Sequence, residues 1–120
     1  MPETATLVSG PTEPSDVRLK EQVRDLSYGL PELLSLRPVS YRLKSYPSQP
    51  KIGLIAQEVK PVIPEVVYLS PENPEEVEPR YYSINYAELV PLLVKSIQEQ
   101  QESIAAFQSR LERLEAPITQ

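Results

Sequence analysis

The sequence predicts an α+β fold, a small mixed domain of short helices and a few short strands followed by a long C-terminal helix. Strong helix formers run almost without interruption from Ala87 to Pro117, which indicates the long helix. Val39, Tyr41 and Leu43 alternate with polar residues, a pattern typical of a half-buried strand. A chain of 120 residues has room for one small domain beside that helix, so its core should be thin and oligomerisation should help to stabilise it.

The N-terminal part divides at Ser15. Residues 1–14 mix Pro, Thr, Glu and Gly and predict an extended lead-in. Ser15 is a candidate N-cap with Asp16 in the first helical turn, where the helix dipole favours an anion. Four apolar residues then follow at spacings of four, three and four, which predicts one helical face: Leu19, Val23, Leu26 and Leu30.

The rest of the domain is predicted from its turn residues and apolar runs. Pro31 at a first helical position favours a short second helix. We expect, in chain order, that helix over 31–36, the strand from Val39, a turn over 47–50, a buried strand over 52–56, a brief helical turn within 57–63, a strand over 65–69, an acidic Pro-rich loop over 70–80 and a last short strand over 82–86.

The C-terminal helix carries a repeat of 3.5 residues over four heptads, as in a coiled coil. The repeat leaves dimer and trimer open, and a polar residue at one core position costs stability while fixing register. The alternative is an ordinary amphipathic helix packed on the domain's own core. The predicted seam comprises Val90, Leu93, Ile97, Gln100, Ile104, Phe107, Leu111 and Leu114.

Composition excludes several classes of function. The net charge of −5 argues against a nucleic-acid partner, because phosphate contacts need clustered Lys and Arg. No apolar run is long enough for a membrane span. The absence of Cys and His leaves no common metal site, and three glycines form no phosphate loop, so we expect neither metal nor cofactor. Any catalysis must use Ser, Lys, Asp, Glu or Tyr.

Several motifs together resemble one family, the intramolecular chaperone of endosialidase, also called the peptidase S74 domain. It occurs at the C-terminus of phage tail spikes and fibres, of bacterial surface proteins and of the myelin regulatory factor. The match spans roughly residues 15–115. The motifs are Ser-Asp-Val-Arg-Leu-Lys (15–20), Leu-Arg-Pro-Val-Ser-Tyr (36–41), Gly-Leu-Ile-Ala-Gln-Glu-Val (53–59), Ile-Pro-Glu-Val-Val (63–67) and the run from 84 to 99.

The resemblance implies a parallel homotrimer whose C-terminal helices form a coiled coil. Such domains align three copies of a passenger and then release themselves by cutting before the Ser of the Ser-Asp motif, with a Ser-Lys dyad. Here this implies catalysis by Ser15 and Lys20 at the Pro14–Ser15 bond, and a fibre or spike passenger supplied upstream or in trans. The implied setting is a virion tail, the host cytoplasm during assembly, or a bacterial surface.

The residue pattern itself leaves the dyad open. On a regular helix Lys20 would lie about 140° from Ser15, so either Ser15 lies outside the helix on a lead-in that folds back, or Lys20 comes from a neighbouring subunit. The plainer alternative is a capping Ser15 and a solvated Lys20. Only 14 residues precede Ser15 and Pro14 is stiff, which favours a structural trimer that does not cut itself, such as a fibre tip or an adaptor subunit.

Four further residues are candidates for supporting the dyad: Asp16, Arg18, Gln57 and Glu58. For Gln57 and Glu58, capping of the following turn is the alternative. The predicted organisation is a lead-in over 1–14, a chaperone core over 15–86 and a trimerisation helix over 87–120.

Overall fold

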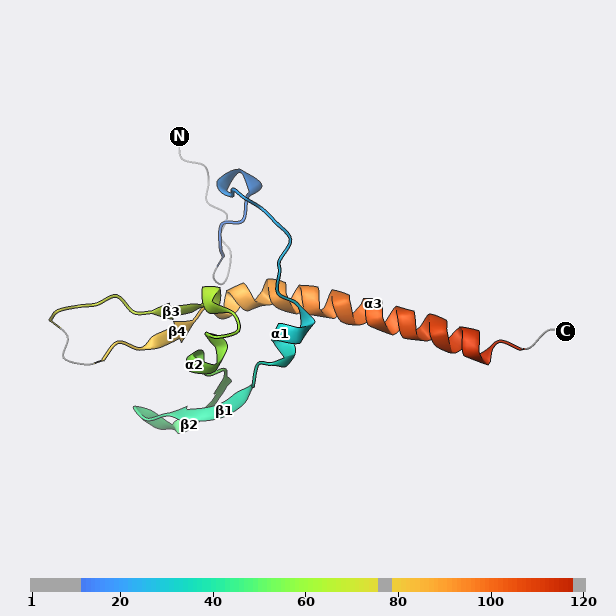
Figure 1. Cartoon of the computed structure of the whole chain (residues 1–120). Helices are drawn as coiled ribbons and strands as arrows, with labels where there is room; N and C mark the ends of the chain where they lie inside the picture. Colours follow the sequence, from blue (N-terminus) through green and yellow to red (C-terminus); the bar gives the residue numbers. More distant parts are fainter. Residues whose placement is uncertain (1–11, 76–78, 118–120) are drawn as a thin grey trace.

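The structure is a computed structural model that describes residues 12–75 and 79–117. The folded body lies around the first half of one long helix, whose second half projects away from it (Figure 1). In chain order the elements are η1 (Val17–Leu19), α1 (Leu30–Leu34), β1 (Val39–Leu43), β2 (Tyr46–Gly53), α2 (Ala56–Val59), η2 (Pro64–Val66), β3 (Val67–Leu69), β4 (Tyr82–Ile84), η3 (Tyr86–Leu89) and α3 (Val90–Glu115). This arrangement confirms the α+β class and the long C-terminal helix.

Two antiparallel pairs of strands flank the body. β1 pairs with β2, from Val39 opposite Gly53 to a bulge after Arg42, and β3 pairs with β4. The chain reverses at Lys44 and Ser45, so the turn predicted over 47–50 is wrong. Both strands of a two-stranded sheet are edges, so prolines are tolerated within β2.

The hydrophobic core is small. Its five buried apolar residues come from α2, η2, η3, α3 and the segment after α2: Val59, Ile63, Val66, Leu89 and Leu92. The chain exposes 11086 Å², against roughly 6,600 Å² for a compact monomer of this mass.

Two faces of α3 have different roles. Leu92 and Ser96 are buried where α3 lies along α1, together with Leu89 just before the helix. The predicted seam lies one residue further along, about 100° around the helix, and stays exposed. The domain core therefore does not use the heptad positions, and packing of the seam on the chain's own core is ruled out within the described residues.

The helix predicted from Ser15 through Leu30 does not form. Only the single 3-10 turn of η1 is present, and the chain then runs extended to α1, with Gln22 in the left-handed region at φ 54°. Val17 and Leu19 are each 73% exposed and Val23 is 71% exposed. A helix this short is not stable in water unless its apolar face is covered, and in the single chain nothing described covers this one.

Some of the other sequence predictions are confirmed and others are wrong. α1, α2, β3 and β4 confirm the short helix with Pro31 in its first turn, the brief helical turn and the last two strands, with shifted ends. The buried strand over 52–56 is wrong, because β2 ends at Gly53 and Ile52 is 86% exposed. Within the described residues, no helix has the length and apolar character to cross a membrane.

Candidate functional site

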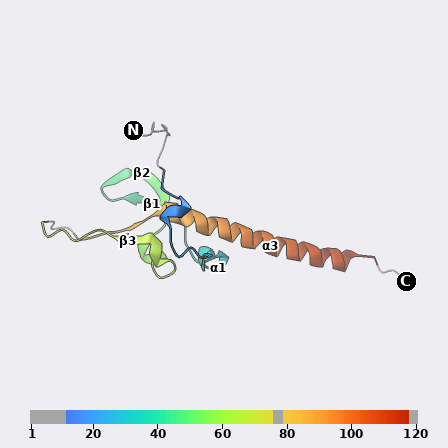
Figure 2. The ribbon, with the colours of Figure 1, turned by 90° about the horizontal axis from the view of Figure 1, so that it is seen from above.

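The segment Ser15–Val23, called here the arm, carries the first predicted site. In Figure 1 it stands on one side of α3, with the β1–β2 hairpin and α2 on the other. Figure 2, turned by 90°, shows η1 over the start of α3. Among the described residues, every hydrogen bond and ion pair of the arm joins two residues of the arm. The arm is thus held together locally and is not packed on the body.

Ser15 and Lys20 meet within one chain. Lys20 Nζ donates a hydrogen bond of 2.9 Å to Ser15 Oγ. Ser15 precedes η1 and Lys20 is its C-cap, so the tight 3-10 turn between extended flanks brings together two side chains that an α-helix would separate. The first of the two predicted geometries, Ser15 outside the helix, is the one observed, and both residues are exposed in the single chain.

Asp16 and Arg18 fix the turn between those two residues. Asp16, rather than Ser15, is the N-cap, and its Oδ1 accepts from the Arg18 backbone N at 2.8 Å. The Arg18 guanidinium also forms an ion pair with the Asp16 carboxylate, in which Nη2 lies 2.7 Å from Oδ2. These bonds lower the pKa of Asp16 and raise that of Arg18. The sequence predicted the N-cap one residue too early, at Ser15, because Ser and Asp are both favoured at N-cap positions.

A strap over residues 24–29 connects the arm to the body, and three contacts anchor it. Lys95 Nζ donates to the Leu26 carbonyl, and Tyr28 Oη donates to Glu65 at 2.7 Å. The Glu65 contact is the main reason that the pKa of Tyr28 is raised. At the end of the strap Glu99 accepts from the Leu30 N at 3.4 Å. The anchoring Lys95 and Glu99 were missed from the sequence, where they look like ordinary solvated charges four residues apart.

The second predicted site is the seam of α3. Its apolar members expose between 43% and 80% of their surface: Val90, Leu93, Ile97, Ile104, Phe107, Leu111 and Leu114. From Gln100 onward every described residue of the helix is exposed. The seam is therefore an apolar stripe, interrupted only by Gln100, that runs from the body along α3 and is not covered by any described residue.

Residues 15–68 match the family model described as chaperone of endosialidase. This segment is a chaperone-of-endosialidase domain. The match begins at Ser15, the first residue of the arm, and ends within β3. It confirms the family that the sequence motifs suggested, whereas the motif over 84–99 lies beyond the matched residues. A search of curated proteins finds no match.

The remaining motifs of the chaperone domain lie away from the arm. Gln57 and Glu58 belong to α2, on the far side of α3 in Figure 1. Arg37 donates to Glu58 through Nε at 3.0 Å and Nη2 at 2.6 Å, and this contact lowers the pKa of Glu58. Within one chain these residues therefore do not join Ser15 and Lys20, and Glu58 instead ties α2 to the segment before β1.

Gly53 has a packing role. A Cβ on Gly53 would lie 2.7 Å from Tyr86 Oη and 3.2 Å from a ring carbon of Tyr41. Tyr86 Oη accepts a hydrogen bond of 2.9 Å from the Leu54 backbone N. Tyr86 thus holds the end of β2 against η3. The sequence did not predict this role for any particular tyrosine.

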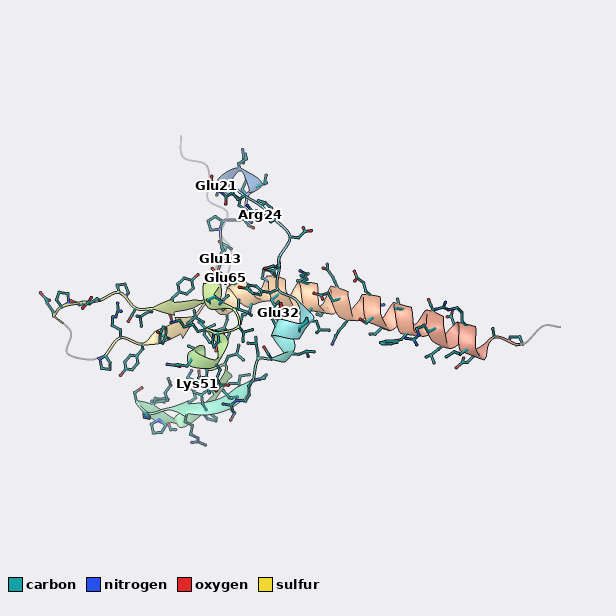
Figure 3. The ribbon with its side chains drawn as sticks, in the orientation of Figure 1. Glu13, Glu21, Arg24, Glu32, Lys51 and Glu65 are labelled. Carbon is teal, nitrogen blue, oxygen red and sulfur yellow. The ribbon has the colours of Figure 1, made fainter. Side chains whose placement is uncertain are left out.

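Side chains of the described residues form no cluster of three potential metal ligands. Figure 3 shows the charged residues spread over the arm, α1, η2 and β2, among them Glu21 and Arg24 near η1, Glu32 on α1 and Lys51 on β2. The two sites that the structure offers are thus the Ser15–Lys20 pair and the apolar stripe.

Proposed function

We propose that this chain is a trimerising intramolecular chaperone for a fibre- or spike-type passenger, which then releases itself by cutting the Pro14–Ser15 bond. Three observations support the proposal: the chaperone-of-endosialidase match, the uncovered stripe on α3, and the contact between Ser15 and Lys20. The contact is the observation that carries the self-cleavage. The proposed setting is phage assembly or a bacterial surface.

The stripe supports a parallel coiled coil. Three copies of α3 packed along their 3.5-residue repeat would bury the apolar positions, with Gln100 setting the register. The helices would then hold three passengers side by side at one end, so that their chains begin folding in register. The local concentration of passenger segments would rise as it does for any linked set of binding modules.

The chemistry of the cut follows from the Ser15–Lys20 contact. With Lys20 neutral, Nζ takes the proton of Ser15 Oγ while the oxygen attacks the Pro14 carbonyl carbon. The C–N bond breaks, the proton passes to the Ser15 nitrogen, and residues up to Pro14 remain as an ester on Oγ. Water then hydrolyses this ester, leaving a carboxylate on Pro14 and a free amine on Ser15. Each chain reacts once.

Lys20 becomes a base only if its environment is drier than in the single chain. A lysine in water is charged at neutral pH, and desolvation lowers the pKa by disfavouring the charged form. Lys20 is exposed in one chain, so its activation requires a covering partner. Cleavage would therefore follow trimer formation, which protects a passenger from release before its three copies are aligned.

Intact mass after expression tests the cut. The wild-type chain should lose residues 1–14, whereas Ser15→Ala and Lys20→Met should keep them, since each removes one member of the pair. Lys44→Met is the matched control, because Lys44 is an exposed lysine on the β1–β2 turn, and it should cleave like wild type. Full-length product from the wild-type trimer would refute self-cleavage. The alternative function, a permanent structural trimer, would then remain, and the exposure of Ser15 and Lys20 in one chain favours it.

A further inference from the structure

The arm carries an apolar surface that the described residues of its own chain leave uncovered. Val17 and Leu19 of η1 are each 73% exposed, and Val23 just beyond is 71% exposed. A 3-10 turn held only by bonds among its own residues gives no reason for three large apolar side chains on one short segment. Their presence indicates a surface that docks.

A groove of matching character lies between the strap and the start of α3. It has a volume of about 680 Å³ and is lined by Asp25 and Leu26 of the strap and by Val90, Pro91, Val94, Lys95 and Gln98 of α3. Leu26 is 37% exposed, Val90 54% and Val94 50%. The floor is therefore apolar and open, and the polar groups lie among its lining residues.

We infer that the arm of one copy docks in this groove of a neighbouring copy, with Val17 and Leu19 on Leu26 and Val94, beside the end of the seam at Val90. The inference rests on the proposed trimer, and it names the surface that covers the Ser15–Lys20 pair. Each subunit would give its arm to one neighbour and receive an arm from the other. Such a head-to-tail contact forms a closed ring when the rotation between neighbours is a third of a turn, as the proposed parallel trimer requires.

The groove and the stripe adjoin, which points to a second copy as the occupant. Val90 belongs to both, and Val94 lies one turn after Val90 at the edge of the stripe. A copy that packs along the stripe is therefore already beside the groove. The chain's own arm points away from α3 (Figure 1). In the sequence, Leu26 of the groove is only three residues after Val23. The arm would reach its own groove only by a sharp reversal of the strap.

Docking would have a chemical consequence at Lys20. Lys20 follows Leu19 directly, so a neighbour that covers Leu19 would lie close to the Ser15–Lys20 contact and would reduce its access to water. The contact between the arm and the neighbouring subunit would thus remove water from Lys20. Loss of docking should lower the rate of cleavage while leaving the coiled coil, and hence the trimer, in place.

Cross-linking between differently tagged copies tests the contact, and the chain has no native cysteine to interfere. Copies with Val17→Cys and copies with Val94→Cys, both in a Ser15→Ala background that keeps the chain whole, are co-expressed and treated with a short bis-maleimide reagent. A cross-link between the two tags is expected. Val17→Cys with Ile52→Cys is the control, because Ile52 is 86% exposed but lies on the β1–β2 hairpin. This pair should not cross-link.

The outcomes separate the inference from the proposed function. A trimer by light scattering without the Val17–Val94 cross-link overturns the docking and keeps the trimer. Cross-links that join two Val17→Cys copies instead also overturn it. A monomer refutes the trimer itself. A double variant that keeps Ser15 and carries Val17→Asp and Leu19→Asp should cleave at least tenfold more slowly while it remains a trimer. An unchanged rate of cleavage would contradict the link between docking and chemistry.

Discussion

Replacing Ile104 and Leu111 by Asp should dissociate the assembly. Both residues lie on the part of α3 that projects beyond the body, and they are 49% and 53% exposed in the single chain. Full burial of such a side chain is worth about 1.5–3 kcal/mol, so covering the exposed half contributes about 1 kcal/mol. Two positions in three chains then contribute roughly 6 kcal/mol, about four orders of magnitude in the association equilibrium. Uncompensated charge in the seam adds to that loss.

Light scattering measures the result directly. The wild-type chain should have a mass of about 41 kDa, three times 13.6 kDa, and the double variant should fall to the single-chain mass. Ser109→Asp is the matched control, since Ser109 lies on the same stretch of helix but opposite the seam, and it should remain a trimer. A wild-type monomer, or a variant that keeps the trimer mass, would refute the coiled coil.

Three further predictions concern the body. Ser96 is 1% exposed and its hydroxyl has no hydrogen-bond partner among the described residues, so Ser96→Ala should raise the free energy of unfolding by roughly 1 kcal/mol in urea titrations, and by more than the exposed Ser103→Ala. Gly53→Ala should lower it by about 1–3 kcal/mol through the clash with Tyr86 Oη, and by less in a Tyr86→Phe background, which a double-mutant cycle would detect. Arg37 lowers the pKa of Glu58 from its ordinary 4.5, so this pair stabilises the fold above that pH and the contribution is lost as the pH falls. Glu58→Gln should therefore make the free energy of unfolding fall less at acid pH. An unchanged pH profile would contradict the assignment.

The sequence predicted those parts of the fold that depend on local patterns. The 3.5-residue repeat of α3 and the alternation in β1 are each read from one segment, and both are confirmed as elements. The turn over 47–50 was wrong because prolines break a strand only where their neighbours need the missing N–H donor. That need depends on how many strands a sheet has, which no single segment shows.

The candidate site was predictable in identity but not in geometry. The family motif named Ser15 and Lys20, yet their contact depends on a 3-10 turn whose cap is Asp16. Asp16, Arg18 and their mutual bonds appear in the sequence only as two charges two residues apart. Glu58 contacts Arg37 and not the arm, because two motifs of one family pattern need not lie close together in one subunit.

The arm and α3 show why equal apolar spacing gave different structures. Both segments carry an apolar face that the chain does not cover, but α3 begins on a second face, where Leu92 and Ser96 pack on α1. Once that start is fixed, each added residue costs little and the helix continues outward. The arm has no such start: its anchors lie at the far end of the strap, and Gln22 at φ 54° turns the chain before they are reached. A neighbouring surface would therefore change the arm far more than α3, so protection of the Val17–Val23 amides from hydrogen exchange should rise most between monomeric and assembled chains.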